Sequence, residues 1–158
     1  MSQHGIGVLA ATPRVGRATV GEAFARALAA KDRGQLAELL SEEVDFEALT
    51  PGRHWVAATS TEAVDEVMLR HWLKPDDVVL EIRSLTSGQV ADRQRVGYRL
   101  AVRRDGRDHV LEQQAYYVAD GQQISWIRIL CSGYRPAENE LVQIPGDDRD
   151  TQKEFHHA

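Results

Sequence analysis

Two neighbouring carboxylates could act as an acid–base pair. Asp45 and Glu47 are two residues apart, so on a strand they lie on one face, where one could give up a proton that the other takes. The same alternation places both opposite the apolar Phe46. We therefore favour a solvated strand face over a catalytic pair.

His71 and Cys131 are the other candidates for proton transfer or nucleophilic attack. His71 lies late in a predicted helix, beside Trp72, where it could act as a base, although stabilising the C-terminal end of the helix is the favoured role. Cys131 is the only cysteine, and the predicted strand register puts His109 on the opposite face. We therefore predict that the thiol is a small buried hydrophobic group.

The composition narrows the classes of partner. One cysteine excludes an intramolecular disulfide and a multi-cysteine zinc site, and the six histidines show no metal-ligand spacing, so we expect no metal and no cofactor. A net charge of -5 argues against nucleic acid. No run approaches the roughly 18 apolar residues that span a bilayer, and the apolar piece at residues 6–11 lacks the preceding positive charge of a signal peptide. We expect a cytoplasmic protein without a membrane partner.

Three helices are predicted in the first half of the chain. Thr19 and Glu22 have the spacing of a capping box at the start of the first helix, and Asp32 can cap a second, shorter one. A third helix begins near Ser60, and Pro75 ends it because a proline disfavours helical geometry in the residue before it.

Strands account for most of the remaining chain. Two short ones flank the turn signal Pro51-Gly52, and Ser87-Gly88 is expected to end a third. The predicted strands cover residues 44–49, 55–57, 78–85, 96–103, 109–119 and 124–133. Asp105-Gly106 and Asp120-Gly121 each have the residues of a two-residue hairpin turn.

These two turns predict the register of the last three strands. If each Asp-Gly pair is the centre of its turn, Arg104 pairs with Arg107 and Ala119 with Gln122. The register then places a polar row on a mostly apolar face. That row consists of Tyr98, Gln113 and Arg128.

A polar row among apolar rows must meet water or form hydrogen bonds, because burying an unpaired polar group costs about 1–3 kcal/mol. On that face Arg128 needs an anion, which either a protein carboxylate or a ligand could supply. The opposite face is also too apolar to meet solvent. We expect helices to cover one face and a second copy of the chain to cover the other, as a homodimer.

The order of these elements resembles the NTF2-like superfamily, which has the cystatin-like cone fold and includes the SnoaL-like polyketide cyclases and the ketosteroid isomerases. The resemblance runs from about Val20 to Pro136. Its most similar pieces are Phe24-Ala25-Arg26-Ala27-Leu28 and Val44-Asp45-Phe46-Glu47 before Pro51. Gly97-Tyr98-Arg99, Glu112-Gln113-Gln114-Ala115-Tyr116 and Leu130-Cys131-Ser132-Gly133-Tyr134-Arg135-Pro136 resemble a subgroup without an assigned function.

The resemblance implies an α+β fold in which three N-terminal helices pack on a curved antiparallel sheet around a pocket. The domain would cover residues 18–136, between a flexible arm (1–17) and a polar tail (137–158). The ligand-binding residues would be Tyr98, Gln113, Arg128, Trp126 and Tyr117, bordered by Trp55 and Trp72.

The residues that carry chemistry in this superfamily have no counterpart here. Ala48 stands where ketosteroid isomerases have an aspartate base, and the first helix lacks a tyrosine. Residues 125–131 lack the acid that SnoaL-like cyclases use. The first hypothesis is therefore that the protein binds an apolar small molecule. The alternatives are a lyase, isomerase or cyclase that stabilises an enolate through Tyr98 or Arg128, and a non-catalytic dimerisation or partner-binding scaffold.

Overall fold

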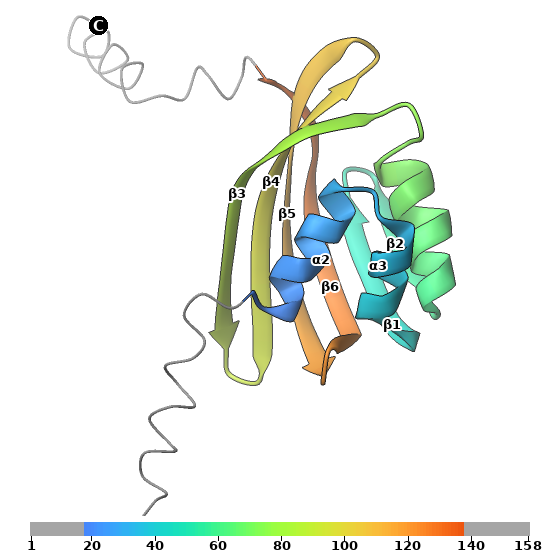
Figure 1. Ribbon diagram of the computed structural model, residues 1–158, viewed down its shortest axis with the longest axis vertical. Coiled ribbons are helices and arrows are strands. Elements are labelled where there is room, and N and C mark those ends of the chain that lie inside the picture. Colours follow the sequence, from blue (N-terminus) through green and yellow to red (C-terminus); the bar gives the residue numbers. More distant parts are fainter. Residues whose placement is uncertain (1–17, 138–158) are drawn as a thin grey trace, which may run out of the picture.

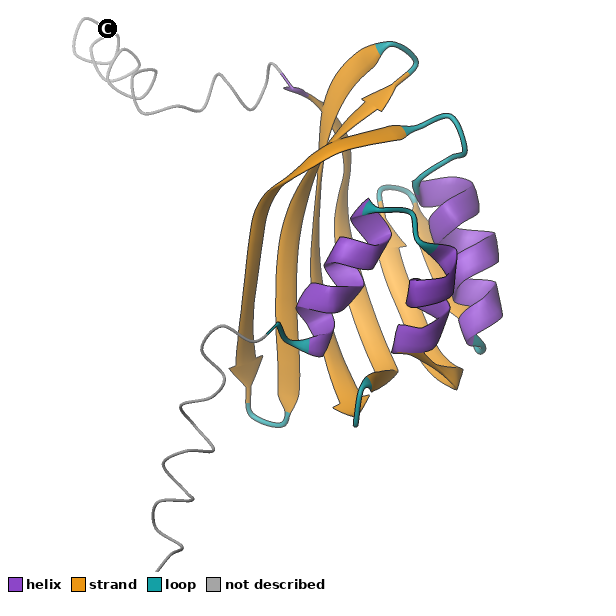
Figure 2. Ribbon diagram, in the orientation of Figure 1, coloured by secondary structure: helices purple, strands orange, loops and turns teal. Residues whose placement is uncertain are grey.

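Three helices lie on one face of a curved six-stranded sheet in the computed structural model, which describes residues 18–137 (Figure 1). We call the face that the helices cover the inner face and the opposite one the outer face (Figure 2). The predicted arm at residues 1–17 and all but the first residue of the predicted tail lie outside the described residues.

Side-chain caps define the first two helices as predicted. In α2 (Val20–Ala29) the hydroxyl of Thr19 accepts a hydrogen bond from Glu22 N at 3.0 Å, and the Glu22 carboxylate accepts one from Thr19 N at 3.2 Å. In α3 (Arg33–Leu39) the Asp32 carboxylate accepts from Gln35 N at 3.0 Å. Each cap satisfies N–H groups that the helix itself leaves unpaired.

The predicted third helix is η2 (Glu62–Trp72), which is a π-helix. The hydrogen bond at its end has the five-residue spacing of a π-helix, since Leu73 N donates to Met68 O. Its buried positions are Ala63, Val64, Val67, Met68 and Trp72. Among them Ala63, Met68 and Trp72 are five and four residues apart, a spacing that the wider helix keeps on one face.

The sheet has the strand order β2-β1-β6-β5-β4-β3. The strands are β1 (Leu40–Thr50), β2 (Arg53–Ala57), β3 (Val78–Val90), β4 (Arg93–Arg104), β5 (Arg107–Asp120) and β6 (Gln123–Pro136). Between residues 18 and 137, β1 and β6 are the only neighbouring strands that run parallel. The predicted strand end at Ser87-Gly88 is wrong, because β3 continues to Val90 and the chain turns at Ala91 with a φ of 52°.

The first predicted hairpin register is confirmed. Asp105 and Gly106 both have positive φ, at 53° and 75°, as a type I′ turn requires. Arg104 therefore pairs with Arg107, and the register continues without a shift to Tyr98 and Gln113.

The second predicted register is wrong. Here Gly121 and Gln122 form the turn, Gly121 has a φ of 68°, and Asp120 pairs with Gln123. A glycine at the first central position favours a type II′ turn, which moves the centre by one residue. A bulge between Val118 and Ala119 shifts the pairing again.

The bulge between Val118 and Ala119 exchanges the two faces of β6. Gln113 pairs with Cys131, and Tyr116 pairs with Arg128. Cys131 therefore lies on the inner face, whereas Arg128 and Trp126 lie on the outer face, opposite to the prediction.

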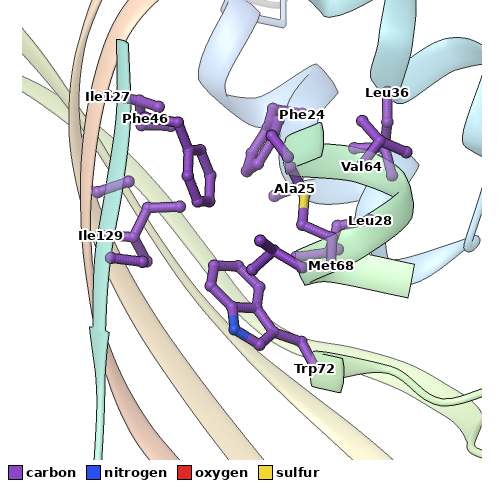
Figure 3. Packing of buried hydrophobic residues seen from close by; sticks show 14 of the residues in the cluster. Phe24, Ala25, Leu28, Leu36, Phe46, Val64, Met68, Trp72, Ile127 and Ile129 are labelled. Carbon is purple, nitrogen blue, oxygen red and sulfur yellow. The ribbon is translucent and has the colours of Figure 1, made fainter. Parts of the chain in front are cut away.

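The hydrophobic core fills the space between the helices and the inner face (Figure 3). Phe24 of α2 and Met68 and Trp72 of η2 point toward the sheet, where Phe46 and Ile127 meet them (Figure 3). The ring centroids of Phe46 and Trp72 are 5.9 Å apart. None of the helices between residues 18 and 137 combines the length and the hydrophobicity that a membrane crossing needs.

Candidate functional site

A cavity of about 420 Å³ opens at the end of the core, between the C-terminal end of η2 and the sheet. We call it the cone-end cavity. Its lining residues are Thr50, Pro51, Trp55, His71, Trp72, Arg104, Leu111, Cys131, Ser132, Gly133, Tyr134 and Arg135. Among the described residues that line it there is no carboxylate, and the aromatic rings come from β2, η2 and β6.

Trp55 and His71 form one wall of this cavity. Their ring centroids are 5.0 Å apart. The guanidinium of Arg53 also lies over the Trp55 ring, 3.6 Å from its centroid. The indole N–H of Trp55 donates to Thr50 Oγ1 at 2.8 Å. The ring of Trp55 is therefore held in place by contacts within the β1–β2 hairpin.

The tautomer of the neutral His71 ring follows from its hydrogen bond. Its Nδ1 lies 2.7 Å from Glu66 O, and a carbonyl oxygen only accepts, so Nδ1 carries the hydrogen. In the neutral ring Nε2 is then unprotonated. This tautomer can take up a proton at Nε2.

Arg104, another lining residue, forms an ion pair with Asp77, which does not itself line the cavity. Arg104 donates to both oxygens of Asp77, at 2.9 and 2.6 Å, and also to Trp72 O at 3.1 Å. Its guanidinium lies 3.8 Å from the centroid of the Tyr134 ring, and the Tyr134 hydroxyl donates to Trp72 O at 2.5 Å. These contacts fix the end of η2 against β4 and β6.

Asp77 is charged despite its burial. Only 4% of the residue is exposed. Burial alone would raise its pKa, but hydrogen bonds from Arg104 and Lys74 N and the positive charges of Arg104 and Lys31 outweigh that effect and hold the pKa below its ordinary value.

Five of the predicted ligand-binding residues lie on the inner side of the sheet. Trp55 and Trp72 line the cone-end cavity. Tyr98, Gln113 and Tyr117 are buried deeper under the helices. The Tyr98 hydroxyl donates to Gln113 Oε1 at 2.5 Å, and the Tyr117 hydroxyl accepts from Gly21 N at 2.8 Å.

Arg128 and Trp126 lie on the outer face and do not reach the cavity, because the β5–β6 register is shifted. Arg128 forms ion pairs with Asp45 at 3.0 Å and with Glu47 at 3.4 Å, so its anion is a protein carboxylate. Trp126 lies within cation–π distance of Arg128, at 4.6 Å from the ring centroid. Asp45 and Glu47 accordingly lie on a solvated face, as favoured from the sequence.

Apart from Trp55 and Trp72, the lining residues were not predicted as ligand-binding, and neither was Asp77, the partner of Arg104. Arg104 was detectable, because strand alternation puts it on the same face as Leu100 and Val102. Cys131 was assigned to the wrong face by the β5–β6 register. Asp77 and Tyr134 depend on contacts between residues far apart in the chain, and no local pattern marks them.

We expect Asp77→Asn to destabilise the fold by about 3 kcal/mol, because it leaves the partly buried Arg104 without its counter-charge. Because the folded-state pKa of Asp77 is lowered, its contribution is present above the ordinary carboxyl pKa and is lost as pH falls through the lowered value. Urea unfolding of the wild type and the variant between neutral and acidic pH measures both effects.

The matched control is Asp108→Asn, which breaks the exposed Arg103–Asp108 pair at 2.8 Å. An unfolding free energy at neutral pH that is as low in this variant as in Asp77→Asn would contradict a special role for the buried pair.

Structural comparison gives three informative neighbours. An NTF2-like protein from Burkholderia thailandensis has a TM-score of 0.53 at 13% identity, covering 73% of this chain and 92% of that one. A candidate polyketide cyclase from Pseudomonas putida has a TM-score of 0.52 at 16% identity, covering 72% and 91%. An epoxide hydrolase of the LEH-like type from Mycobacterium tuberculosis has a TM-score of 0.54 at 13% identity, covering 72% and 80%.

Sequence comparisons identify no relative, since no protein-family model and no curated protein matches the chain. These three structural neighbours are under 25% identical to the chain, so the likeness concerns the fold and not the chemistry. The three helices and the six-stranded curved sheet agree with that likeness. The chain has the NTF2-like cone fold.

Proposed function

We propose that this protein binds an apolar small molecule in the cone-end cavity. The carrying observation is the cavity itself, whose walls combine Trp55, Trp72 and Leu111 with a few fixed polar groups. Ligand sites in proteins are commonly built in this way, at volumes of roughly 300–1,000 Å³. The polar groups are held by protein contacts before any ligand enters, which reduces the ordering cost of binding.

The single cysteine gives a direct test of occupancy. Cys131 lines the cavity and is largely buried, so a ligand seated there should slow its alkylation by iodoacetamide by about tenfold or more when saturating. Aromatic and isoprenoid ketones and carboxylates that raise the thermal midpoint would be tested, with the modification followed by mass spectrometry.

The same compounds added to urea-unfolded protein serve as the control and should leave the alkylation rate unchanged. Compounds that stabilise the fold without protecting Cys131 would place the ligand elsewhere and contradict the proposal.

A second proposal is that the bound compound is turned over, as in a lyase, isomerase or cyclase acting on an enolisable substrate. His71 supports it, because Nδ1 is held as a donor to Glu66 O and Nε2 can act as a base. In such a step Nε2 takes the proton from the carbon next to a carbonyl. The electrons of that C–H bond move to the carbonyl oxygen as an enolate, and the proton then returns to carbon.

Deuterium exchange separates binding from this chemistry. If His71 is the base, a bound ketone should exchange its α-protons in D₂O, and His71→Gln should slow the exchange by about a hundredfold with little change in affinity. NMR integration of the α-proton signal measures the rate. His54→Gln, on the outer face, is the control, and exchange no faster in the wild type than in buffer would refute the enzyme alternative.

A third proposal is that the outer face forms a homodimer and that the protein works as a scaffold. Leu49, Val56, Tyr116 and Leu130 are exposed hydrophobic residues on β1, β2, β5 and β6. Between them runs a groove whose rim includes Glu47, His54 and Arg128. A patch that is apolar in the middle and carries both signs of charge can pair with a second copy of itself across a two-fold axis.

Sedimentation velocity tests the dimer. We expect the wild type to sediment as a dimer and Leu130→Glu to sediment as a monomer, because Leu130 is 61% exposed on the outer face and a carboxylate there would be buried in the interface. Val90→Glu is the control, since Val90 is similarly exposed, at 56%, but lies on the distant strand β3. A monomeric wild type would refute this proposal without affecting the ligand site.

A further inference from the structure

β3 is the outermost strand at one side of the sheet, and among residues 18–137 it is paired only with β4 (Figure 1). In an antiparallel ladder every second residue of such a strand directs its N–H and C=O groups away from the neighbouring strand. A free row of this kind can accept an added strand, and native proteins commonly block it with bulges, charges or proline. β3 has this protection along only part of its length.

The first half of β3 is protected. The ladder with β4 is shifted between Val79 and Glu81 and again between Ile82 and Ser84. Each shift is a bulge that disturbs the regular row of donors and acceptors. Glu81 and Arg83 also form an ion pair here, at 2.6 Å. Bulges and charged side chains together make this half a poor template for another strand.

The second half of β3, residues 84–90, has neither form of protection, and we call it the open edge. It pairs residue for residue with residues 93–99 of β4, without a shift. Its sequence, Ser-Leu-Thr-Ser-Gly-Gln-Val, contains no charged residue and no proline. Only Leu85 and Ser87, on the inner face, are partly buried, and the other residues are exposed. The open edge is therefore a regular and accessible template for an added strand.

Arg95 places a positive charge on the open edge. It pairs with Gly88 across the ladder, and it lies on the outer face because its neighbour Val96 is buried on the inner one. Gly88 leaves room for the guanidinium, since a Cβ at that position would lie only 2.9 Å from Arg95 Nη2. The guanidinium donates to Thr86 Oγ1 at 3.4 Å and has no carboxylate partner among residues 18–137. The glycine thus allows a cation without a counter-charge to lie across the edge strand.

The charges at the open edge disfavour a second copy of the chain as the added strand. On the inner face Ser87 Oγ donates to the Glu22 carboxylate at 2.7 Å, so this side of the edge is negative. Two open edges paired about a two-fold axis would bring Arg95 near Arg95 and Glu22 near Glu22. Like charges that face each other across paired strands are destabilising. A peptide with a carboxylate on the Arg95 side avoids this repulsion and neutralises the cation.

We propose that the open edge binds an extended peptide segment of a partner protein as a seventh strand, with an acidic side chain of the peptide on Arg95. Main-chain hydrogen bonds to β3 supply the affinity, and the guanidinium supplies the preference for acidic sequences. The peptide side chains on the inner face are uncharged or basic, because they lie beside Glu22. This surface is separate from the cone-end cavity, since none of the described residues that line the cavity belongs to β3.

Two synthetic heptapeptides test the charge preference. Both alternate threonine with valine and are blocked at their ends, and they differ only in having glutamate or lysine at the central position. NMR titration of the ¹⁵N-labelled full chain should show saturable shifts of the amide signals of residues 84–90. The glutamate peptide should bind about fivefold more tightly at low salt, and added salt should reduce the difference.

Arg95→Gln should abolish the preference for the glutamate peptide. Arg93→Gln is the matched control and should retain it, because Arg93 lies on the same strand but already pairs with Asp92 at 3.0 Å. Equal affinities of the wild type for the two peptides, or a preference that survives in Arg95→Gln, would overturn the assignment of Arg95.

Two N-methylated forms of the glutamate peptide test the strand pairing itself. In an added strand only every second N–H group points toward β3. Methylation of one alternate set of peptide nitrogens should therefore abolish binding, and methylation of the other set should leave it. A slip by one residue does not rescue the first form, because it moves the glutamate from Arg95 to the face of Glu22. Equal binding of both forms would overturn the addition of a strand.

Hydrogen exchange of the free, full-length chain tests whether the open edge is available. We expect the outward-pointing amides of residues 84–90 to exchange without protection. Protection that rises with protein concentration would show that a second copy occupies the edge, and protection independent of concentration would show that the chain itself does. Either result would overturn the proposal, as would the absence of shifts at residues 84–90 with both peptides.

Discussion

The pairing of β5 with β6 determines which side chains the core and the cavity contain. A type II′ turn at Gly121 and Gln122, followed by the bulge at Val118 and Ala119, sets this register. With it, Ile127, Ile129 and Cys131 face the helices. A slip of one residue would bring Arg128 onto the inner face under the helices, where it would lose both of its carboxylates and be buried without a partner. The turn alone moves the pairing by two residues and keeps the faces, so it is the bulge that tertiary burial requires.

The cavity depends on how η2 ends. Trp72 is the last residue of this π-helix, and its carbonyl, which no further turn of helix uses, accepts from Arg104 and Tyr134 instead. Asp77 completes the arrangement by balancing the charge of Arg104. The polar contacts that close the end of the helix are thus the same contacts that shape one wall of the site.

Features that depend on neighbouring residues could be predicted from the sequence. The caps at Thr19 and Asp32 are examples, and so is the hairpin at Asp105-Gly106, where both residues suit a positive φ. The second hairpin could not be predicted in the same way, because Asp120-Gly121-Gln122 fits two turn types and no pattern marks the bulge. Within the site, Trp55 and Trp72 were predictable from the fold. The pairing of Asp77 with Arg104 joins residues 27 positions apart and follows only from packing.

The parallel pairing of β1 with β6 bears on how the chain folds. β3 to β6 are joined by short turns and can assemble by local hairpin formation. β1 can pair with β6 only after β6 has formed. The two strands are far apart in the chain, since Asp45 and Arg128, which contact each other, are 83 positions apart. Closing so long a loop costs chain entropy, and this cost is offset only by the contacts that form when β1 and the helices dock together. The cone-end cavity, which needs both parts, is therefore among the last features to form, and the chain exposes the inner face until that step.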